Sequence, residues 1–128
     1  MQEAIYSDGQ GGHVERDVQL VKDFVAAVPG FEDLYDAHVF NEGGVLSIVF
    51  FWEVVRETVS SFLGGDETDW RVTLRFLEEQ LRLDVREVNQ VVASFLFYLP
   101  WPHQPGYGLV DHLGPSMRAK FATIRPAG

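Results

Sequence analysis

Apolar residues in this chain recur with the period of an α-helix, and glycine or proline interrupts each run. The valines within residues 14–28 follow one another at alternating spacings of four and three, which places them on one helix face. Residues 88–99 carry a second stripe of the same kind. The dipeptides Pro29-Gly30 and Gly64-Gly65 follow such runs, where helices commonly end. The sequence therefore predicts an all-α protein and requires no strand.

A length of 128 residues fits one domain. Glycine and polar residues dominate the start of the chain, so residues 1–13 are predicted to form a flexible N-terminal arm before a helical domain over residues 14–125. That domain is expected to be single and compact, with five to six helices. They span residues 14–28, 31–39, 45–63 and 84–99, with a further helix beginning at Asp66 and the last one beginning at Pro115.

The segment 45–63 is predicted to be the central and most buried helix, because its first half is apolar all round. Its polar residues share one face, and an apolar group that includes Trp52 is expected to point inward on the opposite face. Asp66 and Asp84 are candidate N-caps of the next two helices. Leu83 and Val88 occupy the positions of a hydrophobic staple around the second of these caps.

Residues 99–108 contain three prolines and two glycines, which predicts a stiff, non-helical loop before the C-terminal helix. The aromatic residues of this loop allow two interpretations. In one, Trp101 folds back over the core of the preceding helix. In the other, Trp101 and Tyr107 anchor a protein partner, because Trp and Tyr are frequent in interface hot spots.

The chain offers few side-chain patterns typical of catalysis or metal binding. It has no cysteine, and its four histidines include no pair at helical i, i+4 spacing, so we expect surface or loop histidines and no metal or cofactor. The neighbouring acids Glu78 and Glu79 are expected to lie on a solvated face. A non-enzymatic protein is therefore predicted; the competing enzymatic hypothesis would use Glu53, Glu57, His38 or His112.

Charge is the stronger functional clue. The chain has 10 basic and 19 acidic residues, a net charge of −9, which disfavours nucleic acids and anionic membranes as partners. Residues 1–64 carry most of this charge, with 11 acids and 3 bases. An acidic surface has two possible explanations: it keeps the protein soluble, or it steers the protein toward a basic protein partner. The candidate binding carboxylates are Asp17, Asp23, Glu32, Asp33 and Asp36.

No secretory signal is recognisable at the N-terminus, and the apolar run at residues 45–52 is too short to span a membrane. These two observations, together with the lack of cysteine, favour a cytoplasmic location.

Three segments carry a resemblance to a known group of proteins: residues 21–39 (VKDFVAAVPGFEDLYDAHV), 91–100 (VVASFLFYLP) and 113–121 (LGPSMRAKF). With the residues between them they cover roughly positions 14 to 125. The chain resembles a family of small, acidic, single-domain bacterial proteins of unknown function, which are similar to immunity proteins that bind and block a cognate toxin. The family pattern implies no catalytic motif. Its signature residues have structural roles, and in this chain they are Ser94, Phe95, Leu99, Pro100, Leu113, Gly114 and Pro115.

The expected function is therefore that of a cytoplasmic protein-binding domain, an immunity protein or antitoxin whose acidic helical face covers a basic toxin. The alternative is a small-ligand or regulatory domain with a pocket between the central helix and the proline loop. Phe51, Trp52, Phe95 and Trp101 are the candidate lining residues of that pocket. A second copy of the chain is a further candidate partner, because the central helix is rich in Val and Phe.

Overall fold

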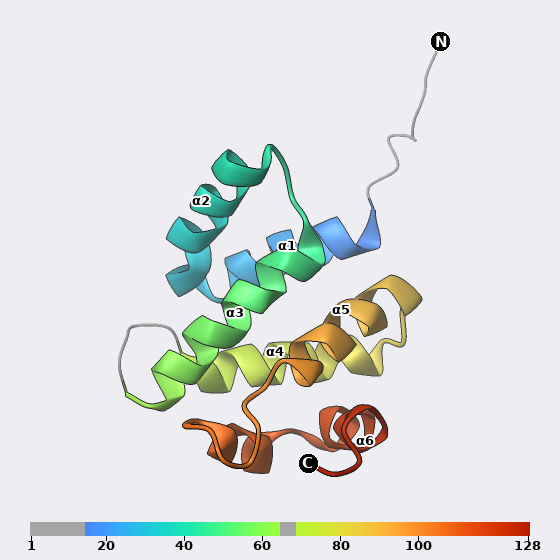
Figure 1. Ribbon diagram of the computed structural model, residues 1–128. Coiled ribbons are helices and arrows are strands. Elements are labelled where there is room, and N and C mark those ends of the chain that lie inside the picture. The colour runs from blue at the N-terminus through green and yellow to red at the C-terminus, as the bar shows by residue number, and fades with distance from the viewer. Residues whose placement is uncertain (1–14, 65–68) are drawn as a thin grey trace.

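The computed structural model describes residues 15–64 and 69–128, which form six α-helices and two short 3-10 turns (Figure 1). No strand occurs in these two ranges, so the all-α prediction is confirmed. The predicted arm of residues 1–13 and the candidate cap Asp66 lie outside the described residues. The helices are α1 (Arg16–Ala27), α2 (Glu32–Glu42), α3 (Ser47–Phe62), α4 (Trp70–Arg82), α5 (Arg86–Phe97) and α6 (Pro115–Ile124), with 3-10 turns at Pro29–Phe31 and Tyr107–His112.

Helix α3 runs through the middle of the molecule and packs against α5, α4 and α1. Figure 1 shows α2 standing at one edge of the bundle, at the upper left, and α6 at the opposite edge. Helix α6 packs on α5 and α4, while α2 packs mainly against the 3-10 turn that precedes it. One continuous core thus joins α1, α3, α4, α5 and α6, with α2 attached at its side.

Phenylalanine rings fill the part of this core between α1 and α3. Phe24 lies 4.9 Å from Phe31 and 5.2 Å from Phe51 between ring centroids, and Phe50 lies 5.6 Å from Phe51. Tilted and edge-on pairs of this kind each contribute about 0.5–1.5 kcal/mol beyond the burial of their area. The predicted apolar stripe of residues 88–99 is also buried, which confirms the inner face of α5.

The predicted cap at Asp84 is wrong. Asp84 adopts a left-handed backbone with φ of 56°, and Val85 occupies the N-cap position of α5. The Asp84 carboxylate accepts a hydrogen bond from the Asn89 side chain at 2.8 Å and bonds no first-turn amide. The staple prediction is wrong too, because Leu83 is 66% exposed. The chain turns so tightly between α4 and α5 that Asp84 serves the turn and Leu83 points to solvent.

Helix α3 is the central helix, as predicted, and has more buried residues than any other described helix, but the apolar first half is not buried on every side. Trp52 was expected on the inner face, but it is 43% exposed, and Ile48 one turn before it is equally accessible. The reason is that α1, α4 and α5 leave one side of α3 uncovered. The Trp52 indole only reaches the rim of α5, where its Nε1 donates to the Ser94 hydroxyl at 3.3 Å.

Candidate functional site

The five predicted carboxylates do not form one surface of equal accessibility. Glu32, Asp33 and Asp36 are exposed on α2, and Asp23 is exposed on α1, where it accepts a hydrogen bond from Gln19 at 2.8 Å. Asp17 is half-buried and accepts a hydrogen bond from the Ser47 hydroxyl at 2.9 Å. That bond ties α1 to the start of α3, so Asp17 has a structural role, and three of the four exposed candidates lie on α2.

Sequence reasoning missed an exposed aromatic residue beside these acids. Phe40 is 87% exposed, the highest value among the large apolar side chains of the described residues. It follows Asp33 by seven residues and Asp36 by four, so all three share one face of α2. The sequence contains a signal for this face, because Phe40 directly follows the predicted helix 31–39 at helical spacing from Asp33 and Asp36. The outer face of α2 (Asp33, Asp36 and Phe40) therefore combines charge with one large ring.

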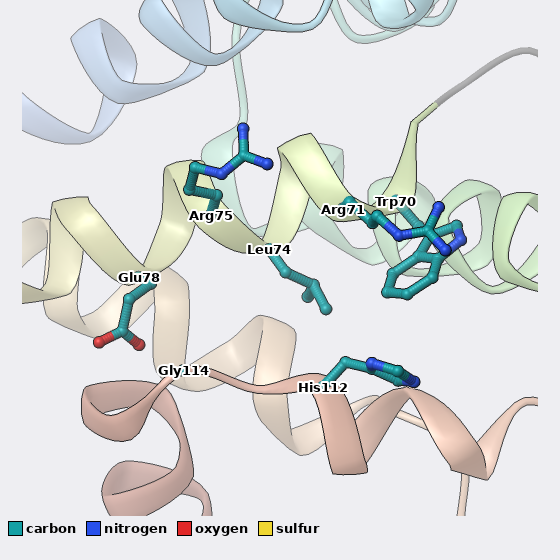
Figure 2. A pocket seen from close by; sticks show the side chains of 7 residues that line it. All are labelled: Trp70, Arg71, Leu74, Arg75, Glu78, His112 and Gly114. Atoms are coloured by element: carbon teal, nitrogen blue, oxygen red, sulfur yellow. The ribbon is translucent and has the colours of Figure 1, made fainter.

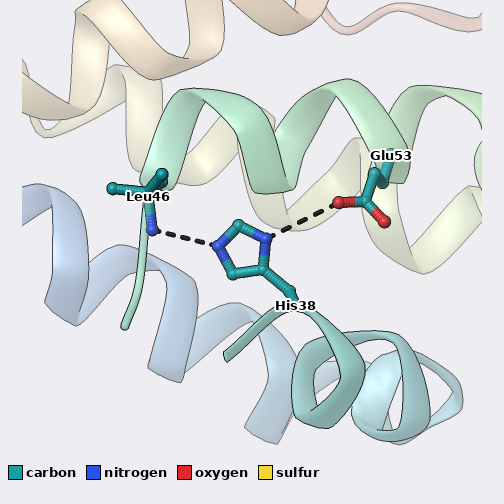
Figure 3. A network of polar contacts seen from close by, with 3 residues as sticks. All are labelled: His38, Leu46 and Glu53. Carbon is teal, nitrogen blue, oxygen red and sulfur yellow. Dashed lines mark hydrogen bonds and ion pairs between the residues drawn. The ribbon is translucent and has the colours of Figure 1, made fainter. Parts of the chain in front are cut away.

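A buried histidine holds α2 to α3 (Figure 3). His38 accepts a hydrogen bond from the Leu46 backbone N–H at its Nε2, over 3.0 Å, and its Nδ1 lies 3.5 Å from the Glu53 carboxylate. Since Nε2 accepts, the proton of the neutral ring sits on Nδ1 and faces that carboxylate. The expectation that His38 is a surface or loop residue is wrong: it is buried and spans the turn between the two helices.

The residues of the enzymatic hypothesis are not assembled into one site. His38 and Glu53 face each other, but the lone pair of His38 is already used by the Leu46 amide. His112 lies on a different part of the molecule, where its ring packs 4.9 Å from Trp70. Glu57, on the helix that also carries Glu53, makes its own contacts within the chain.

The proline loop is organised by a residue that sequence reasoning missed. Arg125 is buried beneath it, and its guanidinium donates to the backbone oxygens of Leu99 at 2.6 Å, Pro100 at 3.0 Å and Gly128 at 2.8 Å. Burial lowers the pKa of this guanidinium, and the Tyr107 hydroxyl opposes that shift. Arg125 thereby fastens residues 126–128 to the end of α5.

Trp101 and Tyr107 surround this arginine. The Trp101 ring covers the Arg125 guanidinium at 3.7 Å and remains 40% exposed. Trp101 therefore shields a buried cation at the end of α5 and does not itself fill the core. Tyr107 is half-buried and packs against the core. Of the two proposed anchors, Trp101 is the more accessible.

A groove does lie between the central helix and the proline loop, but with a different lining from the one expected. Phe51 and Phe95 are fully buried core residues, and Trp101 lies against Arg125. The groove has a volume of about 600 Å³. Apolar side chains form most of it: Val55, Val59, Leu63, Tyr98, Pro100 and Pro105, with Arg56, Ser60 and Gln104 among them.

A second hollow, of about 310 Å³, lies between α4 and the segment leading into α6 (Figure 2). Trp70 and His112 close one end of it, and the Arg71 guanidinium stacks on the Trp70 ring at 4.4 Å. Arg71 and Arg75, four residues apart on α4, give this side of the molecule positive charge, in contrast to α2.

Glu78 lies at the other end of this hollow, and the prediction that it is solvated is wrong. It is buried, and its two oxygens accept hydrogen bonds from the backbone N–H groups of Ser116 and Met117, both at 2.9 Å. Burial by itself raises the pKa of this carboxyl. The two amide bonds, a Ser116 side-chain bond and the charge of Arg82 outweigh that effect, so the pKa is lowered from its ordinary value. Glu78 is thus the cap of α6, supplied from α4.

In residues 15–64 and 69–128, no three His, Asp or Glu side chains converge closely enough to hold a metal ion. None of the helices in these ranges is both long and apolar enough to cross a membrane.

Comparison of the chain with protein-family models, with curated proteins and with solved structures finds no match. The resemblance to immunity-like bacterial proteins therefore stays a prediction. The class that the fold defines is an all-α domain built on a central helix.

Proposed function

We propose that this protein is a protein-binding domain of the immunity-protein or antitoxin type, which holds a basic partner through the outer face of α2. One observation carries the proposal: Asp33, Asp36 and Phe40 lie exposed on a single helix face. Carboxylates steer a basic protein toward its binding site, and an exposed aromatic ring supplies the apolar contact that keeps it there.

The charge around this face supports the same partner chemistry. Residues 15–42 contain seven acids and two bases, whereas the positively charged hollow lined by Arg71 and Arg75 lies on α4. A basic partner is attracted to the first region and repelled by the second, so the charge separation orients it. The position of α2 at the edge of the bundle leaves its outer face open to a large partner.

Part of the acidity of α2 serves the helix itself. Glu32 and Asp33 stand in its first turn, where negative charge stabilises the helix by about 0.3–1 kcal/mol. Asp36 lies beyond the first turn, so reversing it tests recognition with the least effect on the helix. Glu79, exposed in the middle of α4, provides a matched charge reversal away from the proposed face.

The test is affinity capture from a lysate of the cells that express the protein, with wild type, Asp36→Lys and Glu79→Lys compared at low and high salt. We expect a basic protein to be retained by wild type and Glu79→Lys, released by high salt and depleted by Asp36→Lys. With that partner purified, Asp36→Lys should slow association and Phe40→Ala should speed dissociation. A partner that binds Asp36→Lys and wild type equally at both salts refutes the proposal.

The alternative of a small-ligand domain draws on the groove between α3 and the proline loop. Its volume is within the range of ligand pockets, about 300–1,000 Å³. Ligand pockets enclose most of the surface of their ligand, however, whereas Leu63 and Tyr98 at this groove are 58% and 49% exposed. An open apolar groove of this kind is more typical of a protein interface.

A further inference from the structure

The uncovered side of α3 presents a continuous apolar face. Ile48, Trp52 and Val59 follow one another along this helix, and Leu63 is its C-cap. Ile48, Trp52 and Leu63 are 42%, 43% and 58% exposed, whereas Val59 is half-buried beside Gly106 of the proline loop. Helix α5 extends the face sideways, because the Tyr98 ring lies 5.4 Å from the Trp52 ring and itself lines the groove. We call these five residues the α3 face.

The spacing along the α3 face is symmetric. The intervals from Ile48 to Trp52, to Val59 and to Leu63 are four, seven and four residues, so the series reads the same in both directions. If two such helices cross antiparallel, Ile48 of each copy meets Leu63 of the other, and Trp52 meets Val59. Large Trp52 then faces smaller Val59 twice. This self-complementarity is what a two-fold interface requires.

The exposed area is of the size that such an interface needs. With 43–49% of each residue accessible, Trp52, Phe97 and Tyr98 together leave roughly 200–340 Å² open. Ile48 and Leu63 add to this area. A standard interface buries about 800 Å² per partner, of which somewhat more than half is apolar. The α3 face and the adjoining Phe97 therefore supply most of the apolar part of one partner's share.

Charge does not forbid the pairing, although each chain carries −9. The charged residue in the lining of the groove is Arg56, a cation, and it stands next to the midpoint of the symmetric series. The two Arg56 guanidinium groups repel each other near the axis, but each is attracted by the net negative charge of the opposite chain, which offsets part of the repulsion. Helix α2 meets the side of α3 that carries Glu53, about 100° around the helix from Trp52, so the acidic face stays open.

We propose that the chain forms a symmetric homodimer in which the α3 faces of two copies pack antiparallel, with Ile48 of one copy against Leu63 of the other. The dimer does not depend on the partner proposed for α2. It presents two acidic α2 helices, one from each copy.

Cysteine cross-linking tests the pairing directly, because the natural chain has no cysteine. Positions 48 and 63 lie fifteen residues apart, about 22 Å along a helix, so a disulfide between them within one chain is impossible. Ile48→Cys combined with Leu63→Cys should give a covalent dimer on mild oxidation. Each single variant should stay uncross-linked, since residue 48 is then about 22 Å from residue 48 of the other copy. The control, Ile48→Cys with Leu83→Cys, uses an exposed leucine outside the α3 face and should also stay uncross-linked.

Sedimentation of the wild type and of two lysine variants, all without introduced cysteines, provides the second readout. Leu63→Lys should raise the dissociation constant of the dimer about tenfold or more, whereas Leu83→Lys, with the same charge change, should leave it unchanged. Higher salt should tighten the dimer by roughly threefold or more, because it screens the repulsion of two acidic chains. The α2 partner complex should respond to salt in the opposite direction, so failure of one proposal is distinguishable from failure of the other.

A monomer at all salt and protein concentrations overturns the dimer. Cross-linking by a single cysteine at position 48 also overturns it, since it indicates a parallel arrangement, and so does a dimer that Leu63→Lys leaves intact. Far-UV circular dichroism of each variant shows whether the fold is retained, and Leu63 is exposed enough for its substitution to leave the core unchanged.

Discussion

Replacing Glu78 by glutamine is the sharpest test of how the C-terminal third is held in place. Glu78 of α4 accepts the Ser116 and Met117 amides at 2.9 Å each, at the first turn of α6. Gln has nearly the same shape, but only one of its two terminal atoms accepts a hydrogen bond. In Glu78→Gln, one amide therefore keeps a neutral acceptor while the other faces an NH₂ group.

The cost follows from these two changes. Turning a charge-assisted hydrogen bond into a neutral one loses about 1 kcal/mol, and leaving a buried amide without an acceptor costs about 1–3 kcal/mol. We therefore expect the free energy of unfolding to fall by about 2–4 kcal/mol. That is a large share of the roughly 5–15 kcal/mol typical of a whole domain.

The effect also has a defined pH dependence. The pKa of Glu78 is lower in the folded protein than its ordinary value of 4.5, so the unfolded chain binds more protons near that pH. The stabilisation by the carboxylate is thus complete above about pH 4.5 and is lost as the pH falls through the folded pKa. The stability difference between wild type and Glu78→Gln should stay constant from pH 7 to about 5 and shrink below that, because Gln does not titrate.

Urea denaturation followed by tryptophan fluorescence measures both quantities. A loss of 2–4 kcal/mol moves the midpoint by roughly 1–2 M urea. Glu79→Gln, at the exposed neighbouring position, should leave the midpoint almost unchanged. The reasoning is refuted if Glu78→Gln and Glu79→Gln have the same stability, or if the deficit of Glu78→Gln persists undiminished at pH 3.

Three further substitutions test two other buried polar side chains and the close approach of Gly114 to Glu78. Gly114→Ala places a Cβ 2.6 Å from the Glu78 carboxyl and should lower the urea midpoint, but it should cost less when Glu78 is also replaced by Ala. Arg125→Met removes the donors to three backbone oxygens, and we expect a loss of about 2–4 kcal/mol together with proteolytic sensitivity of the proline loop. His38→Leu leaves the Leu46 amide without its acceptor and should cost about 1–3 kcal/mol in urea denaturation, with part of the loss restored by His38→Asn.

Periodicity was enough to predict the helices. The stripe of residues 88–99 is buried as expected, and Pro115 begins α6 as the sequence indicated. These features depend only on residues within one or two turns of each other. They are therefore visible in the sequence before any tertiary contact is known.

Predictions that depended on tertiary packing were less successful. Trp52 has the position of an inner residue in its own helix, but no neighbouring helix covers that side, so the residue is exposed. Glu78 and Arg125 have the composition of surface residues. Their partners lie 38 and 26 residues away along the chain, so no local rule reveals that each is buried. The accessible face of α2 was only half predicted, because the predicted helix ended at residue 39, whereas α2 continues to Glu42 and carries Phe40 on the same face as Asp33 and Asp36.

The same contacts determine how rigid the two proposed surfaces are. Asp69 is the one N-cap residue among the described α-helices whose side chain caps its own helix. Glu78 and Arg125 instead cap α6 and the end of α5 from distant positions, which couples those helix ends to the tertiary fold. Helix α3, which carries the α3 face, packs against α5, α4 and α1 and so belongs to the cooperative core. Helix α2 is held mainly by His38 and by half-buried side chains around it, so its local opening requires less free energy. A rigid α3 face is suited to one fixed partner, a second copy, whereas a loosely attached α2 can adjust to the surface of a different protein.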